Sequence, residues 1–128
     1  MSFENVRFTK EHEWVRLEKG GNLATVGITD FAAGELGDIV YIEFPEVGRE
    51  VRAADAMGTI EAVKTVADLY SPVSGVVKEV NTALNDDPAT VNQSPYDKGW
   101  FVKIELANRS EFDVLMKKDE YDKMVGKD

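Results

Sequence analysis

Hydrophobic and polar residues alternate over short stretches along most of the chain. In residues 13–18, Val15 and Leu17 fall on one face and Arg16 and Glu18 on the other, which is the period of two that predicts a β-strand. Segments rich in β-prone residues predict further strands over residues 6–8, 23–28, 38–44, 49–51, 57–63, 66–70, 73–80 and 100–106. Turn-forming residues separate most of these segments, and such regularly spaced short strands favour a sandwich or small barrel over a parallel α/β fold.

Two other segments have the pattern of short helices. Thr29 or Asp30 can cap a helix over residues 31–36, and Gly37 suits its C-terminal end. Near the end of the chain, Ser110 can cap a helical segment that extends to about residue 125. Because no linker-like stretch interrupts the sequence, we predict a single mainly β domain over residues 1–128, with a short internal helix and a helical C-terminal tail.

The charge balance narrows the range of partners. The 128 residues include 15 Lys and Arg against 24 Asp and Glu, which gives a net charge of −9. Nucleic acids and anionic membranes attract basic surfaces, so neither is expected as a main partner. No hydrophobic run approaches the roughly 20 residues of a membrane span, and the N-terminal residues lack the hydrophobic core of a signal peptide. We therefore expect a cytoplasmic protein of the bacterial type.

The inventory of reactive side chains excludes several kinds of enzyme. The chain has no cysteine and one histidine, His12, which excludes cysteine nucleophiles, thiolate metal sites and multi-histidine metal sites. The glycine-rich phosphate loop of the Walker type is also missing. A hydrolase or lyase is therefore disfavoured, and we expect neither a metal site nor a catalytic residue. Beside Glu11 and Glu13, His12 is expected to be a local hydrogen-bonding or surface residue rather than a base.

One lysine occupies a position where a turn residue is expected. Lys64 and Thr65 lie between the predicted strands 57–63 and 66–70, where a tight hairpin usually carries Asn-Gly or Asp-Gly. A lysine amine held on a rigid turn would be a good acceptor for an acyl group, and lysine is the flexible amine that modifying enzymes use. On the pattern alone, an ordinary solvent-exposed lysine in a longer strand explains Lys64 as well.

Short motifs on both sides of this lysine resemble a known family across nearly the whole chain. In order, they are Glu11-His12-Glu13-Trp14, Thr25-Val26-Gly27-Ile28-Thr29-Asp30, Leu36-Gly37-Asp38-Ile39-Val40, Pro45-Glu46-Val47-Gly48, Glu61-Ala62-Val63-Lys64, Asp68-Leu69-Tyr70-Ser71-Pro72-Val73-Ser74-Gly75, Val80-Asn81, Val91-Asn92, Pro95-Tyr96 and Gly99-Trp100. Each motif is weak by itself, but the series in this order and spacing is specific. It resembles the H proteins of the glycine cleavage system, within the lipoyl-carrier family.

The resemblance implies a lipoyl-type barrel-sandwich hybrid fold in which lipoic acid is attached as an amide to Lys64. Biotin domains have a similar fold, but their lysine lies between two methionines, whereas Val63 and Thr65 flank Lys64 here. Lipoyl domains of 2-oxo acid dehydrogenases usually have Asp before the lysine and lack a helical tail. Both differences favour the H proteins, although Thr65 replaces the small Ala that is common in that family.

The resemblance also implies the role of a carrier rather than an enzyme. An H protein shuttles the aminomethyl group of glycine from a pyridoxal-phosphate-dependent glycine decarboxylase, the P protein, to a tetrahydrofolate-dependent aminomethyltransferase, the T protein. Dihydrolipoyl dehydrogenase, the L protein, then reoxidises the arm, and a lipoate-attaching enzyme is a further partner. The lysine and lipoyl chains together span about 14 Å when extended, at roughly 1.5 Å per bond before zigzag. This reach suits an arm that visits several active sites.

Two acidic residues are candidates for holding the cargo, whose amine should be cationic at neutral pH. By resemblance, Glu13 and Asp68 are expected to line a cleft that receives the loaded arm and shields it from water. The alternative is that both are surface carboxylates. In that case their contact with an amine would contribute little, because an exposed ion pair is worth about 0–1 kcal/mol.

Two further functions remain open at this point. A lipoate relay or storage protein would have the same fold and use the same Lys64 without serving glycine cleavage. An unmodified interaction module would carry a Lys64 that is never acylated in cells. A glycine decarboxylation assay with partner proteins separates the carrier from the relay protein, and the mass of the natural chain tests the interaction module.

Overall fold

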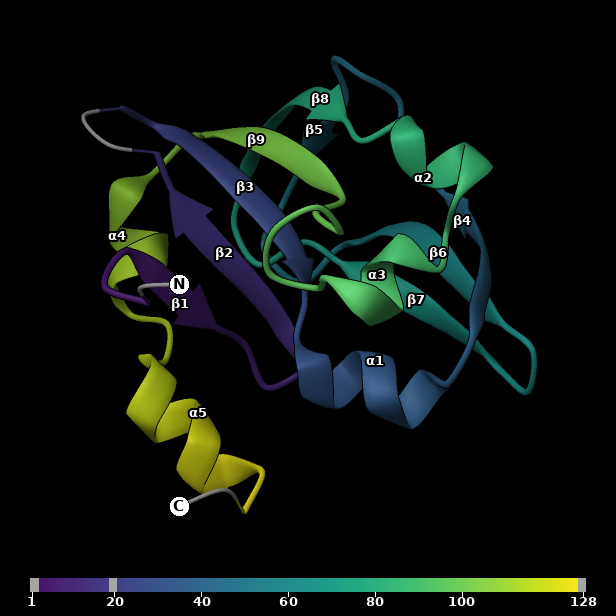
Figure 1. Ribbon diagram of the computed structural model, residues 1–128. Coiled ribbons are helices and arrows are strands. Elements are labelled where there is room, and N and C mark those ends of the chain that lie inside the picture. Colours follow the sequence, from purple (N-terminus) through teal and green to yellow (C-terminus); the bar gives the residue numbers. More distant parts are fainter. Residues whose placement is uncertain (1–2, 19–20, 127–128) are drawn as a thin grey trace.

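The computed structural model describes residues 3–18 and 21–126, and two antiparallel sheets form the body of the molecule within them (Figure 1). The six-stranded sheet contains, in spatial order, β1 (Val6–Phe8), β2 (Glu13–Leu17), β3 (Leu23–Ile28), β9 (Val102–Leu106), β8 (Gly75–Val80) and β5 (Glu50–Val51). The three-stranded sheet contains, in the same sense, β4 (Ile39–Glu43), β6 (Ala56–Ala62) and β7 (Val66–Tyr70). This arrangement confirms the predicted mainly β fold.

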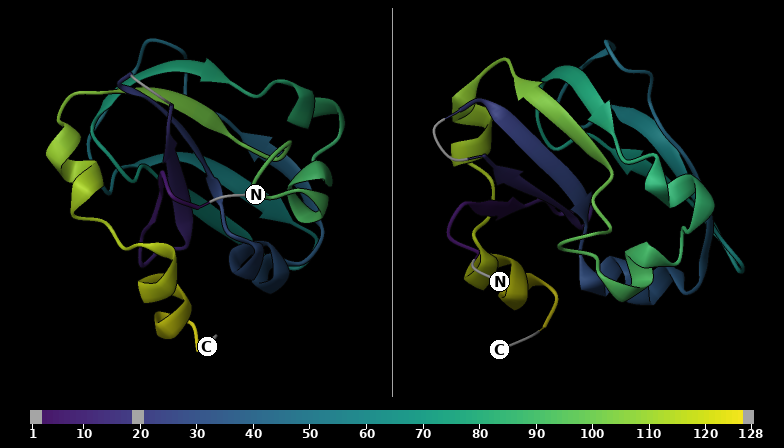
Figure 2. Two further views of the ribbon diagram at one scale, coloured as in Figure 1. Left: turned by 60° about the vertical axis from the view of Figure 1, so that its left-hand side comes forward. Right: turned by 45° about the horizontal axis from the view of Figure 1, so that its top comes forward.

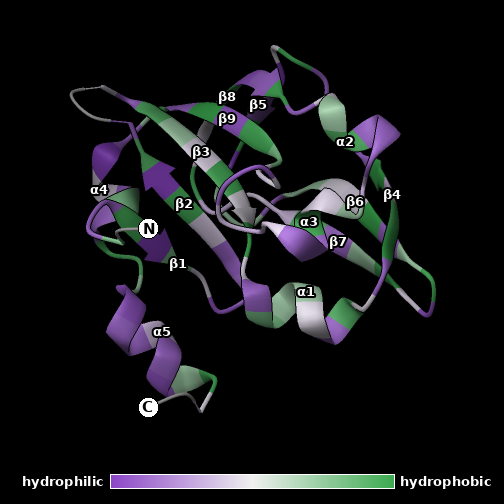
Figure 3. Ribbon diagram, viewed as in Figure 1, coloured by the Kyte–Doolittle hydropathy of each residue, from purple (hydrophilic) through white to green (hydrophobic). Residues whose placement is uncertain are grey.

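The main hydrophobic core lies between the two sheets. Val26 and Ile104 of the six-stranded sheet belong to the same buried cluster as Ile42 and Ile60 of the three-stranded sheet. Burying each such side chain stabilises the fold by about 1.5–3 kcal/mol relative to leaving it exposed. Figure 3 shows the hydrophobic positions recurring along the strands, while most of the C-terminal helix is hydrophilic. Along β9 the alternation read from the sequence separates core from solvent, whereas β3 is buried on both faces apart from Leu23.

The first helix, α1 (Asp30–Leu36), joins the two sheets and has the ends predicted for it. The Thr29 hydroxyl accepts a hydrogen bond from the backbone N–H of Ala32 at 3.1 Å, which caps the helix. At the other end, Gly37 has a φ of 77°, and its N–H donates to the carbonyl of Ala33. Because this backbone conformation favours glycine, the helix ends there and the chain turns into β4.

The remaining helices differ in part from the prediction. The structure adds α2 (Ala83–Asp86) and α3 (Thr90–Gln93), which the pattern did not reveal because four residues are too few to show a helical period. The tail forms two helices, α4 (Arg109–Asp113) and α5 (Lys118–Met124). The prediction that Ser110 caps this segment is wrong. Asn108 is the cap, and its side-chain oxygen accepts from the Ser110 N–H at 3.0 Å.

A second, smaller core attaches the C-terminal helix to the sheet. Val6, Phe8, Trp14 and Tyr121 form this buried cluster, against which Trp100 is partly buried. The α5 helix otherwise lies at the periphery, as the three views in Figures 1 and 2 show. Within the described part of the chain, no helix has both the length and the hydrophobicity needed to cross a membrane.

Candidate functional site

Lys64 lies at the tip of the hairpin that joins β6 to β7. The N–H of Ala62 donates to the carbonyl of Thr65 at 2.8 Å, so only Val63 and Lys64 form the turn. Neither residue has a positive φ, and the turn is therefore not of the primed types that prefer glycine or asparagine. The sequence places a lysine at the tip without backbone strain, and its side chain is exposed.

The junction between α1 and β4 supports this turn from the side. The N–H of Val63 donates to the carbonyl of Asp38 at 2.9 Å, and the Lys64 side chain extends over Gly37. The Asn92 side chain holds the junction by donating to the carbonyl of Gly37 at 2.8 Å and accepting from the N–H of Ile39 at 3.1 Å. The turn is thus fixed to a hydrogen-bonded frame, and among the described residues no hydrogen bond or ion pair occupies the Lys64 amine.

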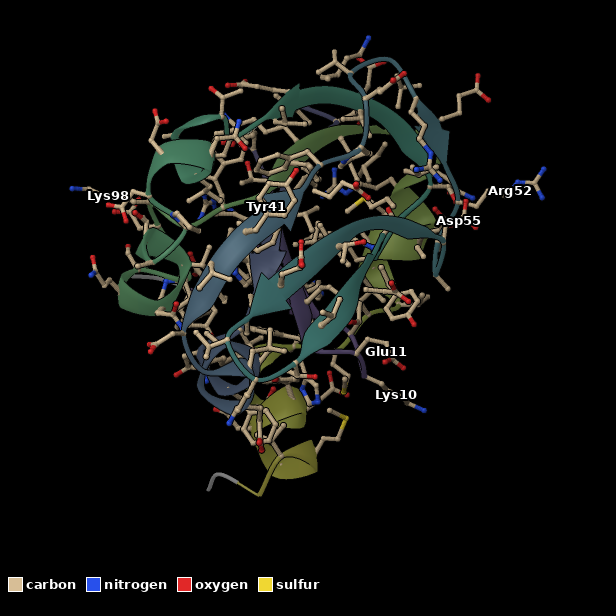
Figure 4. The ribbon with its side chains drawn as sticks, turned by 90° about the vertical axis from the view of Figure 1, so that its right-hand side faces the viewer. Lys10, Glu11, Tyr41, Arg52, Asp55 and Lys98 are labelled. Atoms are coloured by element: carbon tan, nitrogen blue, oxygen red, sulfur yellow. The ribbon has the colours of Figure 1, made fainter. Side chains whose placement is uncertain are left out.

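Exposed hydrophobic side chains surround the turn on the outer face of the three-stranded sheet. Val63 is 75% exposed and Val66 is 62% exposed. Tyr41, 51% exposed, is paired in register with Glu61, which is in turn paired with Val66. Figure 4 views this face, with Tyr41 near its centre. Lys64 therefore lies beside several exposed hydrophobic side chains. The carboxylate of Glu61 lies between two of them, Tyr41 and Val66.

A cleft of about 310 Å³ runs along α1, and we call it the α1 cleft. Its lining includes Glu11, His12 and Glu13 from the segment that enters β2, Phe31, Glu35 and Leu36 from α1, and Ala67 and Asp68 from β7. The structure therefore brings together the two acidic residues singled out in the sequence, although 55 residues separate them along the chain. Both expected residues line one cavity, as an acidic binding cleft requires.

Glu13 and Asp68 differ in their surroundings. Glu13 is 3% exposed, whereas Asp68 lies exposed at the edge of the sheet. Burial raises the pKa of Glu13 from its ordinary value of 4.5 to about 7. Hydrogen bonds from the Thr9 hydroxyl, at 2.6 Å, and from the Tyr70 backbone oppose this rise, and the nearby Glu11 carboxylate adds to it. Glu13 is therefore not a surface carboxylate, whereas Asp68 is one.

The negative field in this region also acts on Tyr70. The neighbouring Asp68 carboxylate raises the pKa of Tyr70, and Glu11 and Glu13 act in the same direction. Tyr70 also lines a second hollow of about 440 Å³, which shares Glu11 and Glu13 with the α1 cleft. Glu13 thus stands between two cavities, in surroundings that favour a cation.

The Lys64 turn lies close to the α1 cleft, which it approaches along both β7 and the end of α1. Asp68 follows Lys64 by four residues, which is about 13 Å along a strand that rises about 3.3 Å per residue. Leu36, at the C-terminal end of α1, lines the cleft directly before Gly37, over which the lysine extends. A group attached to Lys64 can therefore lie along α1 and place its far end near Glu13.

His12 makes a hydrogen bond, but with a residue far along the chain rather than with a local one. Its Nδ1 lies 2.8 Å from the Tyr121 hydroxyl, and its ring packs against Phe31. The contact with Tyr121 joins residues 109 positions apart, so no local signal in the sequence could have revealed it. The support of Glu13 by Thr9 was also missed, although a hydroxyl four residues away is within reach of local inspection. Among the described residues, no group of three or more potential ligands could hold a metal ion.

Comparison with known proteins is consistent with this geometry. The sequence profile of the family described as Glycine cleavage H-protein matches residues 6–128. A protein of Staphylococcus haemolyticus named Glycine cleavage system H protein is 52% identical over 121 residues, or 94% of each chain. The protein of the same name from Anoxybacillus flavithermus is 50% identical over 125 residues, or 98% of this chain and 97% of that one.

A solved structure supports the same conclusion. The crystal structure of a glycine cleavage system H protein from Mycobacterium marinum superposes with a TM-score of 0.87 at 37% sequence identity. The match covers 98% of this chain and 99% of that one, so it includes both sheets and the helical tail. The barrel-sandwich architecture expected from the sequence is thus found in a relative of the same length.

Proposed function

Because the chain belongs to the glycine cleavage H-protein family, whose members have a lipoyl carrier role, we propose that Lys64 is the residue that carries the lipoyl group. The observation that carries the proposal is the exposed, unpaired amine of Lys64 at the tip of a braced hairpin. An amide at this nitrogen removes the charge of the lysine and extends its side chain into a long arm.

The residues around Lys64 fit such an arm. Gly37 lacks the Cβ that would lie 3.3 Å from the Lys64 Cε, and this leaves a path for the side chain across the end of α1. The α1 cleft continues this path with the hydrophobic side chains of Phe31, Leu36 and Ala67. These side chains suit the methylene portion of a lipoyl chain, and the carboxylates of the cleft suit a cationic end.

When bound, lipoate supplies a disulfide that accepts the aminomethyl group of glycine and is reduced in doing so. The chain's own residues then hold the cargo. Glu13 is the main ligand of the cationic amine, because its buried carboxylate lacks a cationic partner among the described residues and is costly to ionise. A bound amine would offset that cost. Asp68, at the exposed rim, adds a second negative charge and helps to draw the amine into the cleft.

Several enzymes must recognise the same arm. We propose that the P, T and L proteins and a lipoate-attaching enzyme approach the hairpin, where Tyr41, Val63 and Val66 offer apolar contact area. Such exposed hydrophobic patches mark interaction surfaces. The net charge of −9 favours partners with positively charged docking surfaces.

We propose that the 128 residues form one carrier domain. The tail does not form a separate unit, because Met116 pairs with Phe8 of β1 and Tyr121 is buried in the small core beside Trp14. The Glu111 side chain also accepts from the backbone N–H of Ser74 at 2.8 Å. Both tail helices are therefore part of the same packed structure as the sheets.

Reconstitution of glycine cleavage tests the carrier role. The lipoylated chain is mixed with the P protein and glycine, and the release of CO2 from the glycine carboxyl is measured. We expect glycine-dependent release with the wild type and none with Lys64→Arg. A lipoylated chain that supports no release but donates its lipoyl group to other acceptor proteins would establish the relay function instead.

The role of the cleft is tested by the lifetime of the cargo. After loading, the P protein is removed, and the formaldehyde and ammonia released by hydrolysis of the aminomethyl group are followed over time. Glu13→Gln should shorten the lifetime by about tenfold, as expected for the loss of a charge-assisted contact worth about 1.5 kcal/mol. Asp68→Asn should have a smaller effect that disappears at high salt, because its carboxylate is exposed. An unchanged lifetime in Glu13→Gln would refute the role of Glu13.

A further inference from the structure

The α1 cleft is held together from outside by the C-terminal helix. Tyr121 of α5 is 1% exposed, and its ring stacks on Phe8 with centroids 4.8 Å apart. Its hydroxyl lies 2.8 Å from the His12 Nδ1 and 2.7 Å from the Thr29 Oγ1. One phenol oxygen thus joins two elements that border the cleft, the segment that carries Glu13 and the start of α1.

Both partners of Tyr121 occupy positions that control the shape of the cleft. Thr29 is fully buried and caps α1, and its backbone N–H donates to the carbonyl of His12 at 3.0 Å. His12 has a φ of 70°, a left-handed conformation that is strained for a residue with a Cβ. Such a conformation persists only when surrounding contacts fix it, and the Tyr121 hydroxyl provides one of these contacts.

The hydrogen bonds form a continuous chain. The N–H of Ala32 donates to the Thr29 hydroxyl at 3.1 Å. When the Thr29 hydroxyl donates to Tyr121 and Tyr121 donates to an unprotonated Nδ1 of His12, every hydroxyl in the chain is satisfied. The ring of His12 also packs against Phe31, with centroids 4.9 Å apart. The conformation of His12, between Glu11 and Glu13, is therefore linked to the start of α1 by the Tyr121 hydroxyl as well as by the backbone hydrogen bond from Thr29.

We propose that Tyr121 is a positioning residue for the α1 cleft, and that its hydroxyl fixes His12 to Thr29 so that Glu13 keeps its place opposite α1. This inference rests on the proposed role of Glu13 as a ligand of the cargo amine. It assigns a function to α5, a peripheral helix whose packing into the small core would by itself explain only its docking.

The carboxyl of Glu13 can report on this arrangement in the unmodified chain. The charged and titratable groups near it are Glu11 and His12 on the same segment, Glu35 on α1, Asp68 and Tyr70 on β7, and Tyr121 on α5. Burial is the main cause of the raised pKa of Glu13. If the segment around His12 loosens and admits water, the midpoint of the Glu13 titration must fall from about 7 toward 4.5.

The test compares Tyr121→Phe with a matched control, Tyr96→Phe, in the full-length chain. Both substitutions keep an aromatic ring and remove a hydroxyl that bonds near the start of α1. The Tyr96 hydroxyl donates to the Asp30 carboxylate at 2.8 Å and has no bond to His12. Carbon-13 NMR of the side-chain carboxyls follows the Glu13 titration in the unmodified chain, and the cargo-lifetime assay follows the lipoylated, loaded chain.

We expect Tyr121→Phe to lower the Glu13 midpoint and to shorten the cargo lifetime by about fivefold, the change produced by about 1 kcal/mol of lost hydrogen-bond free energy. Tyr96→Phe should leave both quantities as in the wild type. His12→Phe, which keeps a ring against Phe31, should reproduce the effect of Tyr121→Phe. The double variant should show no further change, because both substitutions remove the same contact.

A folded Tyr121→Phe chain with the wild-type Glu13 midpoint would overturn the inference, even if its melting temperature were lower, because the hydroxyl would then be only structural. Glu13→Gln separates this failure from a failure of the proposed function. An unchanged cargo lifetime in Glu13→Gln would refute the role of Glu13 as a ligand, whereas the titration in Tyr121→Phe tests the positioning by Tyr121 without any cargo.

Discussion

The Lys64 side chain lies across Gly37, so closely that a Cβ added at Gly37 would be 3.3 Å from the Lys64 Cε. Gly37 also has a φ of 77° and a ψ of −153°, a combination that side-chain-bearing residues avoid. The same glycine therefore ends α1 and makes room for the Lys64 side chain. This relationship between a helix end and a hairpin tip is the basis of the first prediction.

Gly37→Ala should destabilise the protein by about 1–3 kcal/mol, because the new Cβ strains the backbone and presses on Lys64. Gly34→Ala is the matched control within the same helix. No atom lies within 4 Å of a Cβ added at Gly34, so that variant should gain about 1 kcal/mol from the higher helix propensity of alanine. Urea unfolding measures the free energy of unfolding of both variants and of the wild type. A neutral effect of Gly37→Ala would show that the junction is less constrained than its dihedral angles indicate.

Asn92→Ala should loosen the frame that supports the Lys64 turn. The substitution removes the hydrogen bonds of Asn92 to Gly37 and Ile39 and leaves partly buried backbone groups unpaired, which costs about 1–3 kcal/mol. Faster amide exchange at Val63 and a lower rate of lipoylation should accompany this loss. Asn85→Ala, an exposed asparagine in the neighbouring helix α2, should change stability by less than about 0.5 kcal/mol. Equal effects of the two variants would contradict the bracing role.

The stability of the unmodified wild type should fall as pH rises from about 4.5 to about 7. The pKa of Glu13 is raised to about 7 in the folded state, so the folded chain binds the proton more tightly than the unfolded chain over this range. The folded state therefore loses stability until Glu13 is ionised, and the stability contributed by this group is constant only above about pH 8.

Glu13→Gln should remove this pH dependence, because the amide stays neutral. At pH 8 the variant should be more stable than the wild type by up to about 3 kcal/mol, the free energy that corresponds to the shift from 4.5 to about 7. At pH 4 the two should be alike. Thermal unfolding as a function of pH measures the difference, and Glu46→Gln on an exposed turn serves as the control. A wild-type stability that does not change between pH 4.5 and pH 8 would mean that ionising Glu13 does not destabilise the folded state.

The strands and α1 could be predicted from the sequence because their signals are local. Alternation and β-prone composition located the nine strands of residues 3–18 and 21–126 to within a few residues, and Thr29 and Gly37 marked the ends of α1. The cap of α4 was misassigned because Asn108 and Ser110 are both good capping residues, and only the backbone conformation shows which one is used. The proposed role of Lys64 came from the family resemblance, because the sequence pattern alone is equally consistent with an ordinary exposed lysine.

The assembly of the α1 cleft could not be predicted from local patterns. Glu13 and Asp68 were named together by resemblance, and only the packing of β2, β7 and α1 around one cavity shows that they meet. The burial that raises the pKa of Glu13 is likewise a property of the packed structure. Tyr121 appears in the sequence as one aromatic residue in a charged tail, and nothing near it indicates a bond to His12.

The most direct test of the account is the intact mass of the chain after incubation with a lipoate ligase, ATP and lipoate. The wild type should gain the mass of one lipoyl group, and so should Lys98→Arg, in which another exposed lysine is replaced. Lys64→Arg, which keeps the charge but lacks the acceptor amine, should gain none. A lipoyl group on Lys64→Arg, or a wild type that is never modified, would contradict the assignment of Lys64 as the anchor of the arm.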